Sequence, residues 1–194
     1  MGLNRQAKVL SKNQIEVSLL LVSKSRNPIR NRLIFLLSVR AGMRAKEIAG
    51  LKWTMLVDAQ DQLSDEICLL DEASKGKSGR VIPMSKDLKA AIIEWRSSDR
   101  PYPKSDYVIT TERASRTSPQ AIVNLFAGWY RDLGFVGASS HSGRRTAITN
   151  WARKISSVGG SLRDVQVLAG HSALTTTQRY IEAHADAQRK VVEA

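Results

Sequence analysis

The side chains best suited to chemistry are two arginines, two histidines and a tyrosine spread over the whole chain. Arg44 comes first, His141 and Arg144 follow in an H-x-x-R arrangement, and His171 and Tyr180 come last. Two guanidinium groups can bind the non-bridging oxygens of a phosphodiester, and a tyrosine hydroxyl can attack its phosphorus. Each residue alone also has an ordinary explanation as surface charge, helix cap or core aromatic. Only their joint order and spacing make phosphoryl transfer a candidate chemistry.

The segments around these residues match a known pattern. Residues 41–53 read AGMRAKEIAGLKW, residues 141–145 read HSGRR, and residues 168–180 read LAGHSALTTTQRY. They resemble the first arginine box, the H-x-x-R box and the G-H segment with its nucleophile in the tyrosine recombinases, the phage-integrase family. The segment that ends at Tyr180 is the most specific of the three. The resemblance covers about residues 10–185, nearly the whole chain.

The resemblance implies a role for each of the five residues. Arg44 and Arg144 would bind the scissile phosphate of DNA, and Tyr180 would attack it. A phenol ionises only near pH ~10, so the attack needs a base, and we expect His141 to handle this proton. His171 would donate a hydrogen bond to the phosphate. The 3′-phosphotyrosyl bond that results conserves the phosphodiester energy, so the family pattern implies no cofactor and no metal.

A further segment supplies the expected acid. Residues 75–83 read KGKSGRVIP and resemble the β-hairpin that carries the family's catalytic lysine. The spacing to Pro83 selects Lys75 over Lys77. Lys75 would give a proton to the 5′-oxygen that leaves. The basic residues expected to contact DNA are Lys77, Arg80 and Arg145.

The surroundings of both arginines add one candidate and two departures. Glu47 lies one helical turn after Arg44, where the family has a residue that supports the arginine, but a solvated helix-face carboxylate is an equally good interpretation. The family commonly has an apolar residue before the second arginine and a histidine after it. Here Gly143 and Arg145 flank Arg144. Because those positions pack and orient the box, they predict reduced activity.

The composition favours a polyanionic partner. The chain has 30 Lys and Arg against 18 Asp and Glu, a formal net charge of +12 and a sequence pI near 10.2. Such a balance is typical of proteins that bind nucleic acid, with a membrane surface as the competing interpretation. No apolar run approaches the roughly 20 residues of a spanning helix, and residues 1–10 lack the apolar core of a signal peptide. We therefore expect a soluble, cytoplasmic, nucleoid-associated protein that binds double-stranded DNA and no membrane or small-molecule substrate.

Cysteine and histidine give no sign of a metal site. The lone cysteine, Cys68, stands in an apolar stretch and is expected to be a small buried residue. A site built from His141, His171 and His184 is possible by number but unsupported by spacing. The sequence therefore predicts no metal.

The function expected from the resemblance is that of a site-specific DNA recombinase or integrase, which acts as a homo-oligomer, in a tetrameric synapse. A type IB topoisomerase shares the same residue types and is an enzyme alternative. A DNA-binding protein of the same fold that has lost activity is a non-enzyme alternative, which the two departures keep open. A covalent protein–DNA adduct would separate the enzymes from the third class.

The elements that must position these residues are mainly helices. Capping residues and helical spacing predict helices that start at Ser11, at Pro28, at residue 44, after Ser85, at Pro119, at Ser140 or His141 and after Ser161, with a last one that carries Tyr180. Short β-like runs at 54–57, 67–70 and 80–84 predict a small antiparallel sheet. The expected fold is therefore α+β, mainly helical, the catalytic domain of a tyrosine recombinase. We expect a basic flexible arm over residues 1–10 and the catalytic domain over 11–183. The tail over 184–194 either docks on a neighbouring protomer, as the family resemblance implies, or is a frayed terminus.

Overall fold

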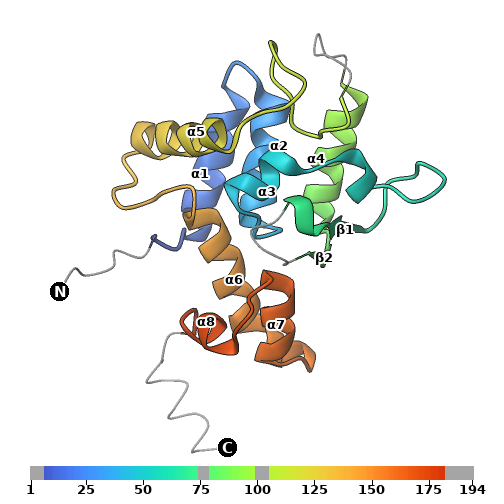
Figure 1. Ribbon diagram of the computed structural model, residues 1–194. Coiled ribbons are helices and arrows are strands. Elements are labelled where there is room, and N and C mark those ends of the chain that lie inside the picture. The colour runs from blue at the N-terminus through green and yellow to red at the C-terminus, as the bar shows by residue number, and fades with distance from the viewer. Residues whose placement is uncertain (1–6, 74–78, 99–104, 182–194) are drawn as a thin grey trace, which may run out of the picture.

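The computed structural model describes residues 7–73, 79–98 and 105–181. Within these ranges the chain forms helices and one small sheet (Figure 1), which confirms the mainly helical α+β class. In chain order the elements are α1 (Lys12–Ser23), α2 (Pro28–Val39), α3 (Ala45–Gly50), β1 (Glu66–Leu69), β2 (Arg80–Pro83), α4 (Lys86–Ser97), α5 (Pro119–Asp132), α6 (Ser142–Lys154), α7 (Leu162–Ala169) and α8 (Leu174–Gln178), with 3₁₀ turns at Trp53–Met55, Asp71–Ala73 and Ile155–Val158.

Side-chain caps fix where several helices begin. At α1 the Ser11 hydroxyl accepts a hydrogen bond from the Gln14 backbone N–H, and the Gln14 side chain accepts one from the Ser11 N–H. Ser161 and Asp164 make the same reciprocal box at α7. These bonds satisfy N–H groups that have no partner within the helix, so the predicted starts of both helices are confirmed.

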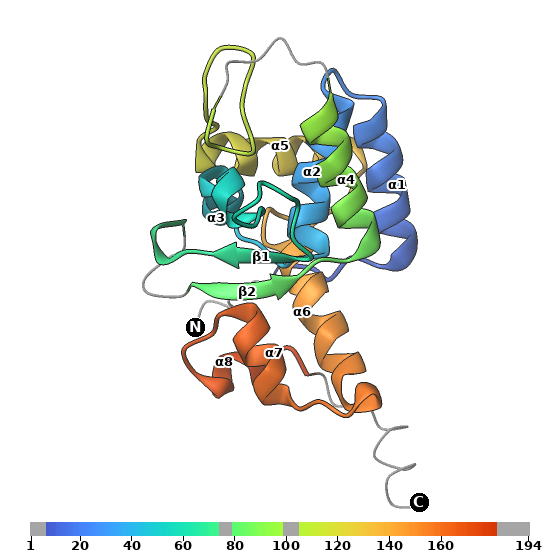
Figure 2. The ribbon, with the colours of Figure 1, turned by 90° about the vertical axis from the view of Figure 1, so that its right-hand side faces the viewer.

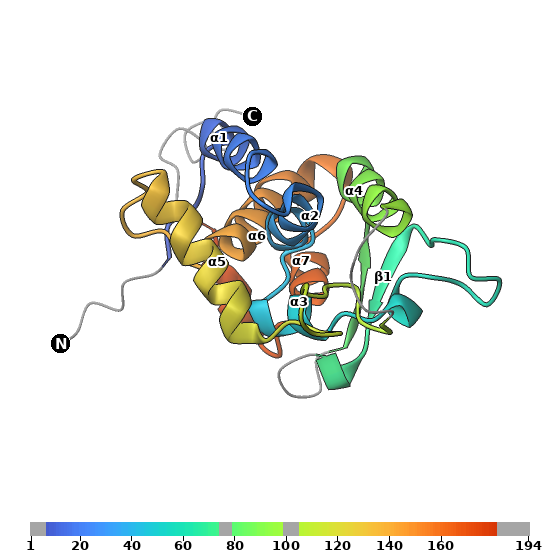
Figure 3. The same cartoon turned by 90° about the horizontal axis from the view of Figure 1, so that it is seen from above.

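The core is arranged around α2. The segment Leu33–Val39 is buried on every side, because α1, α4 and α6 all pack against α2, while α5 packs on α1 and α3. Viewed from above, α2 lies between α1, α4 and α5, with α6 behind it (Figure 3). A smaller apolar cluster of Ile148, Val165 and Ala169 joins α6 to α7. Helix α6 therefore connects the main core to the α7–α8 unit, which lies below β2 in Figure 2.

The sheet is smaller than predicted. Strands β1 and β2 pair antiparallel, with Ile67 opposite Ile82 and Cys68 opposite Val81. Ile67 and Leu69 point into the core, so Cys68, between them, points outward and is exposed. The prediction of a buried Cys68 was wrong because the strand alternation outweighs the apolar composition of the stretch.

The predicted strand at 54–57 was wrong as well. A 3₁₀ turn occupies Trp53–Met55, and the Leu56 N–H donates to the Trp53 carbonyl. This turn buries both Met55 and Leu56 in the core. A strand would have sent these two neighbours to opposite faces of a sheet, so the turn buries more apolar surface.

The packed part of the chain begins before Ser11. Leu10 is buried, and its N–H donates to the Thr146 hydroxyl on α6 at 2.8 Å. The Lys8 N–H reaches the Gly137 carbonyl. Residues 8–10 are therefore not part of a free arm, while residues 1–6 lie outside the described ones. Among the helices described, none is both long and apolar enough to span a membrane.

Candidate active site

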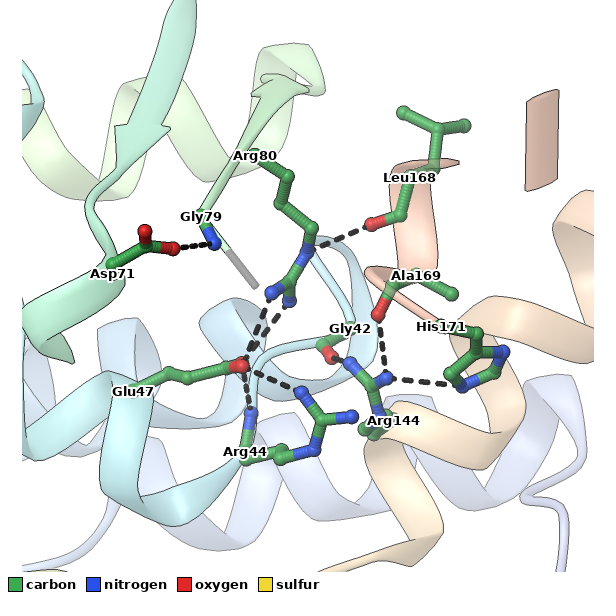
Figure 4. A network of polar contacts seen from close by, with 10 residues as sticks. All are labelled: Gly42, Arg44, Glu47, Asp71, Gly79, Arg80, Arg144, Leu168, Ala169 and His171. Carbon is green, nitrogen blue, oxygen red and sulfur yellow. Dashed lines mark hydrogen bonds and ion pairs between the residues drawn. The ribbon is translucent and has the colours of Figure 1, made fainter. Parts of the chain in front are cut away.

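Five of the predicted site residues meet where α3, α6, β2 and the α7–α8 segment converge (Figure 4). They are Arg44, Glu47, Arg80, Arg144 and His171. Arg44 is the N-cap residue of α3, Arg144 lies in the first turn of α6, and His171 follows the C-cap of α7. These positions are far apart in sequence. The helix packing around α2 and α6 brings them together.

Glu47 holds Arg44. Its Oε1 accepts from Arg44 Nη1 at 2.7 Å, and its Oε2 accepts from the Arg44 backbone N–H at 2.8 Å. The Glu47 side chain is fully buried, whereas 26% of the Arg44 side chain is exposed. Glu47 is therefore no solvated helix-face carboxylate, and Arg44 keeps an accessible edge for an anion.

Glu47 remains ionised in spite of its burial. Burial alone would raise its pKa, but hydrogen bonds and charges from Arg80 and then Arg44 outweigh this effect and hold the pKa below its ordinary value. The site therefore carries a fixed carboxylate between two guanidinium groups.

Arg144 is buried and held by backbone carbonyls. Its Nη1 donates to the Gly42 carbonyl at 2.6 Å and its Nη2 to the Ala169 carbonyl at 2.7 Å. Burial and then the charge of Arg44 lower the pKa of Arg144 to about 10, so it is still protonated at neutral pH. A cation that has lost most of its water and meets only neutral acceptors is well prepared to bind a phosphate.

Two glycines make this arrangement possible. Gly42 has φ +62°, and a Cβ there would lie 2.9 Å from the Trp151 ring. Gly170, the C-cap of α7, has φ +61°, and a Cβ there would lie 2.9 Å from Cδ of Arg80. Both positions need the left-handed conformation and the space that only glycine provides.

His171 is neutral and has a defined tautomer. Its Nε2 lies 3.2 Å from Arg144 Nη2, which can only donate, so Nε2 accepts; its Nδ1 lies 2.9 Å from the Thr177 hydroxyl and carries the proton. Burial and then the charges of Arg144, Arg44 and Arg80 lower the pKa of His171 to about 4. In this state both ring nitrogens are engaged. The hydrogen bond expected from His171 to a phosphate first requires a proton on Nε2 and a shift of Arg144 away from it.

Tyr180 lies beside His171. The two rings stack with centroids 5.5 Å apart and planes inclined by 26°. Helix α8 ends at Gln178, so the prediction that a helix carries Tyr180 was wrong: the residue lies in the turn that follows, with its N–H on the Thr177 carbonyl. Tyr180 is half-buried against the α6–α7 cluster and is close enough to affect the pKa of Arg144.

The other expected site residues are placed less closely. His141 is the exposed N-cap residue of α6, one turn before Arg144, and its side chain has no hydrogen bond within the described part of the chain. Arg145 is half-buried. Lys75 and Lys77 lie outside the described residues.

Arg80 does not have the place predicted for it. We expected a DNA contact, but only 2% of its side chain is exposed, and it forms an ion pair with Glu47. The reason is the strand register, which directs Arg80 inward at the start of β2. Because Val81 and Ile82, which follow it, are both apolar, the sequence did not indicate whether Arg80 points into the core or outward.

The departure at Gly143 has a structural reason. A Cβ at Gly143 would lie 2.3 Å from the hydroxyl oxygen of Ser38 on α2, so the glycine lets α6 approach α2 closely. Ser38 is itself fully buried. The missing apolar side chain is therefore compensated by direct contact between the two helices, and Arg144 is still oriented.

No group of three or more His, Cys, Asp or Glu side chains that could hold a metal ion occurs within 7–73, 79–98 and 105–181. The charged part of the site consists of three arginines and one carboxylate. Its net positive charge suits an anionic substrate rather than a cation.

The fold and these contacts define a class of site: two guanidinium groups and an imidazole beside a tyrosine hydroxyl, suited to a phosphodiester. The family comparison agrees. Residues 8–187 match the model of the phage integrase family, to which this chain belongs.

Similar proteins include two curated recombinases. The chain is 29% identical to tyrosine recombinase XerC of Actinobacillus succinogenes, over 91% of this chain and 58% of that protein. It is 32% identical to tyrosine recombinase XerA of Thermococcus onnurineus, over 84% of this chain and 55% of that protein. The chain thus spans little more than half the length of these relatives.

The fold also matches solved structures. A crystal structure of XerA recombinase superposes with a TM-score of 0.71 at 23% identity, over 94% of this chain and 63% of that one. The Tn1549 transposon integrase in complex with circular intermediate DNA gives a TM-score of 0.78 at 17% identity, over 95% of this chain and 66% of that one. These similarities establish the fold that carries the site.

Proposed function

We propose that this chain is the catalytic part of a site-specific DNA recombinase, which cuts and rejoins DNA through a 3′-phosphotyrosyl bond to Tyr180. The observation that carries the proposal is the convergence of Arg44, Arg144 and His171 beside Tyr180. Residues 11–183 would form the catalytic domain, and the activity requires no cofactor.

The arginines supply the electrostatic part of the reaction. The scissile phosphate binds with one non-bridging oxygen at the exposed edge of Arg44 and the other at Arg144. Attack by the Tyr180 oxygen forms a new P–O bond and breaks the P–O5′ bond, with added negative charge on the non-bridging oxygens in the transition state. Two guanidinium groups held in advance stabilise that charge without reorganisation.

Two protons must move in the same step. The Tyr180 phenol loses one, for which His141 at the start of α6 is the proposed acceptor, and the 5′-oxygen gains one, for which Lys75 is the proposed donor. Burial and then the arginine charges keep His171 neutral, and it would hydrogen-bond the phosphate once the incoming negative charge raises its pKa and it gains a proton. The reverse reaction, with a 5′-hydroxyl as nucleophile, rejoins the strand.

The proposed partner is double-stranded DNA. The net charge of +12 favours a polyanion, and structural neighbours include XerH recombinase bound to difH substrate and a lambda integrase dimer bound to a core site. Because one Tyr180 breaks one strand and exchange between two duplexes breaks four, we propose a tetrameric synapse. Residues 184–194, outside the described ones, are the proposed docking tail.

A basic cleft next to α3 offers a path for the DNA backbone. It has a volume of about 440 Å³, and its lining includes Lys46, Lys52 and Arg116. Lys52 and Arg116 both lie 5.9 Å from the centre of the Tyr107 ring, which positions the two cations. Lys46 is on the same helix whose N-cap is Arg44. A DNA strand bound at Arg44 would therefore pass these cations.

The test uses a nicked DNA duplex that carries a recombination site recovered by binding selection. Cleavage next to the nick releases a short fragment, so the covalent intermediate accumulates. We expect a protein–DNA adduct that survives denaturation, and none with Tyr180→Phe. An adduct of equal yield in Tyr180→Phe would overturn the assignment, and absence of any adduct with the unaltered protein would favour the non-catalytic DNA-binding alternative. Relaxation of supercoiled DNA that lacks the site would favour the topoisomerase.

A further inference from the structure

Arg80 connects three separate parts of the candidate active site. Its Nη1 and Nη2 donate to Oε1 and Oε2 of Glu47, both at 3.1 Å, and its Nε donates to the Leu168 carbonyl at 2.9 Å. The guanidinium therefore links strand β2, helix α3 and the C-terminal end of α7 (Figure 4). Nothing in the reaction proposed above uses this residue.

The two Glu47 oxygens that Arg80 holds are the same ones that hold Arg44. Oε1 accepts from Arg44 Nη1 and Oε2 from the Arg44 backbone N–H. One carboxylate thus accepts four hydrogen bonds from two arginines. The two parallel hydrogen bonds from Arg80 fix the plane of the Glu47 carboxylate. Because Arg44 binds the same carboxylate, they also fix the orientation of the Arg44 guanidinium.

The bond to Leu168 extends the same support to the second arginine. Leu168 is followed by Ala169, whose carbonyl accepts from Arg144 at 2.7 Å. Gly170 comes next, and the absence of its side chain leaves the space that Arg80 fills. The end of α7 that holds Arg144 therefore packs directly against Arg80.

We infer that Arg80 is a positioning residue of the cleavage reaction, which acts through Glu47 on Arg44 and through the end of α7 on Arg144. It would touch neither DNA nor Tyr180, because its side chain is buried. This role requires three N–H donors in one plane, to bind both Glu47 oxygens and the Leu168 carbonyl together, and a lysine ammonium cannot provide them. The inference rests on the proposed function, since it names a further residue for that reaction.

The alternative is a buried ion pair that only stabilises the fold. The positioning role and the purely structural role predict different rates of adduct formation in single and double variants, measured with the nicked duplex at saturating concentration. Arg80→Met alone should reduce the rate of adduct formation by about 10²-fold, the scale expected for one lost stabilising group, with less than about a threefold change in the DNA dissociation constant. Arg40→Met is the matched control, because it removes the Arg40–Asp87 ion pair between α2 and α4, and it should leave the rate within about threefold of the unaltered protein.

The decisive comparison is between Arg44→Ala and the double variant Arg44→Ala/Arg80→Met. If Arg80 acts through Arg44, its loss should cost at most about tenfold once Arg44 is gone, instead of about 10²-fold. Arg80→Lys keeps the charge without the fork and should recover less than a tenth of the lost rate. Equal losses in the two backgrounds, full rescue by lysine, or an unchanged rate in Arg80→Met would each overturn the inference.

Folding is followed by thermal unfolding of each variant. If Arg80→Met does not fold, the same comparison is made with Arg80→Lys, and if neither folds, Arg80 serves the fold alone and the inference is wrong. The unaltered protein distinguishes the two proposals: without its adduct the proposed function fails, whereas with its adduct and an unaffected Arg80→Met only the positioning role fails.

Discussion

Acid should destabilise this protein through His171, and the size of the effect follows from the site. Burial and the three arginines lower the pKa of His171 from 6.5 to about 4. Because the unfolded chain binds this proton more readily than the folded one, stability is fully present above pH ~6.5 and is lost as the pH falls toward ~4. The full gap is worth about 3 kcal/mol at 1.36 kcal/mol per pKa unit. Since His171 is half-exposed, solvent screening reduces this to roughly 1–2 kcal/mol.

The assay is urea unfolding at several pH values between ~7 and ~5. Ordinary carboxylates remain ionised in this range, and it covers more than half of the expected loss of stability. His171→Gln is the matched variant, because an amide can still accept from Arg144 and donate to Thr177 but does not titrate. Its unfolding free energy should fall less with acid than that of the unaltered protein, by about 1 kcal/mol at pH ~5. Parallel pH curves for the two proteins, or an NMR titration of His171 in the free protein centred near pH ~6.5, would show that the folded protein does not disfavour protonation of His171.

Three further expectations concern the acid, the helix contact and the cleft. Lys75→Ala should cleave ordinary DNA roughly 10²- to 10⁴-fold more slowly than the unaltered protein. Because a thiolate leaves without a proton, a sulfur in place of the 5′-bridging oxygen should restore the cleavage rate of Lys75→Ala but little of the rate of Arg44→Ala. Equal rescue of both variants, or rescue of Lys77→Ala instead, would contradict the role of Lys75. Gly143→Ala should destabilise the fold by about 1–3 kcal/mol in urea unfolding, because its Cβ meets the Ser38 hydroxyl. Adding Ser38→Ala should recover part of that loss. A Gly143→Ala protein as stable as the unaltered one would show that α6 can move away from α2 at no cost in stability. DNA affinity should fall steeply between ~50 and ~200 mM salt, and Lys52→Ala/Arg116→Ala should make the slope of log K against log salt shallower by about 1–2. The control Lys24→Ala, at the C-cap of α1 and outside the cleft, should leave the slope unchanged. A double variant with an unchanged slope would place the DNA elsewhere.

The sequence predicted the helices better than the small sheet. Helix starts are encoded locally, as at Ser11 and Ser161, where one polar side chain satisfies the backbone three residues on. The run at 54–57 has the composition of a strand, but burial of the neighbours Met55 and Leu56 selects a turn. That choice depends on tertiary packing, which a local pattern does not contain.

In the candidate active site, too, the sequence predicted what local spacing encodes and missed what depends on tertiary contacts. Arg44, Arg144, His171 and Tyr180 were found by spacing, and the structure brings them together. The inward direction of Arg80 depends on strand register and on the space left by Gly170, and the compensation of Gly143 depends on Ser38. Both are contacts between segments distant in the chain, so the sequence pattern alone gave no sign of them.

The chemical identity of the covalent bond tests the proposed phosphotyrosyl intermediate most directly. The adduct formed on the nicked duplex is digested with trypsin and nuclease, and the modified peptide is sequenced by mass spectrometry. We expect a nucleotide joined through its 3′-phosphate to Tyr180, in the peptide Tyr180–Arg189. A nucleotide joined to another side chain, or joined through a 5′-phosphate, would exclude the proposed 3′-phosphotyrosyl intermediate.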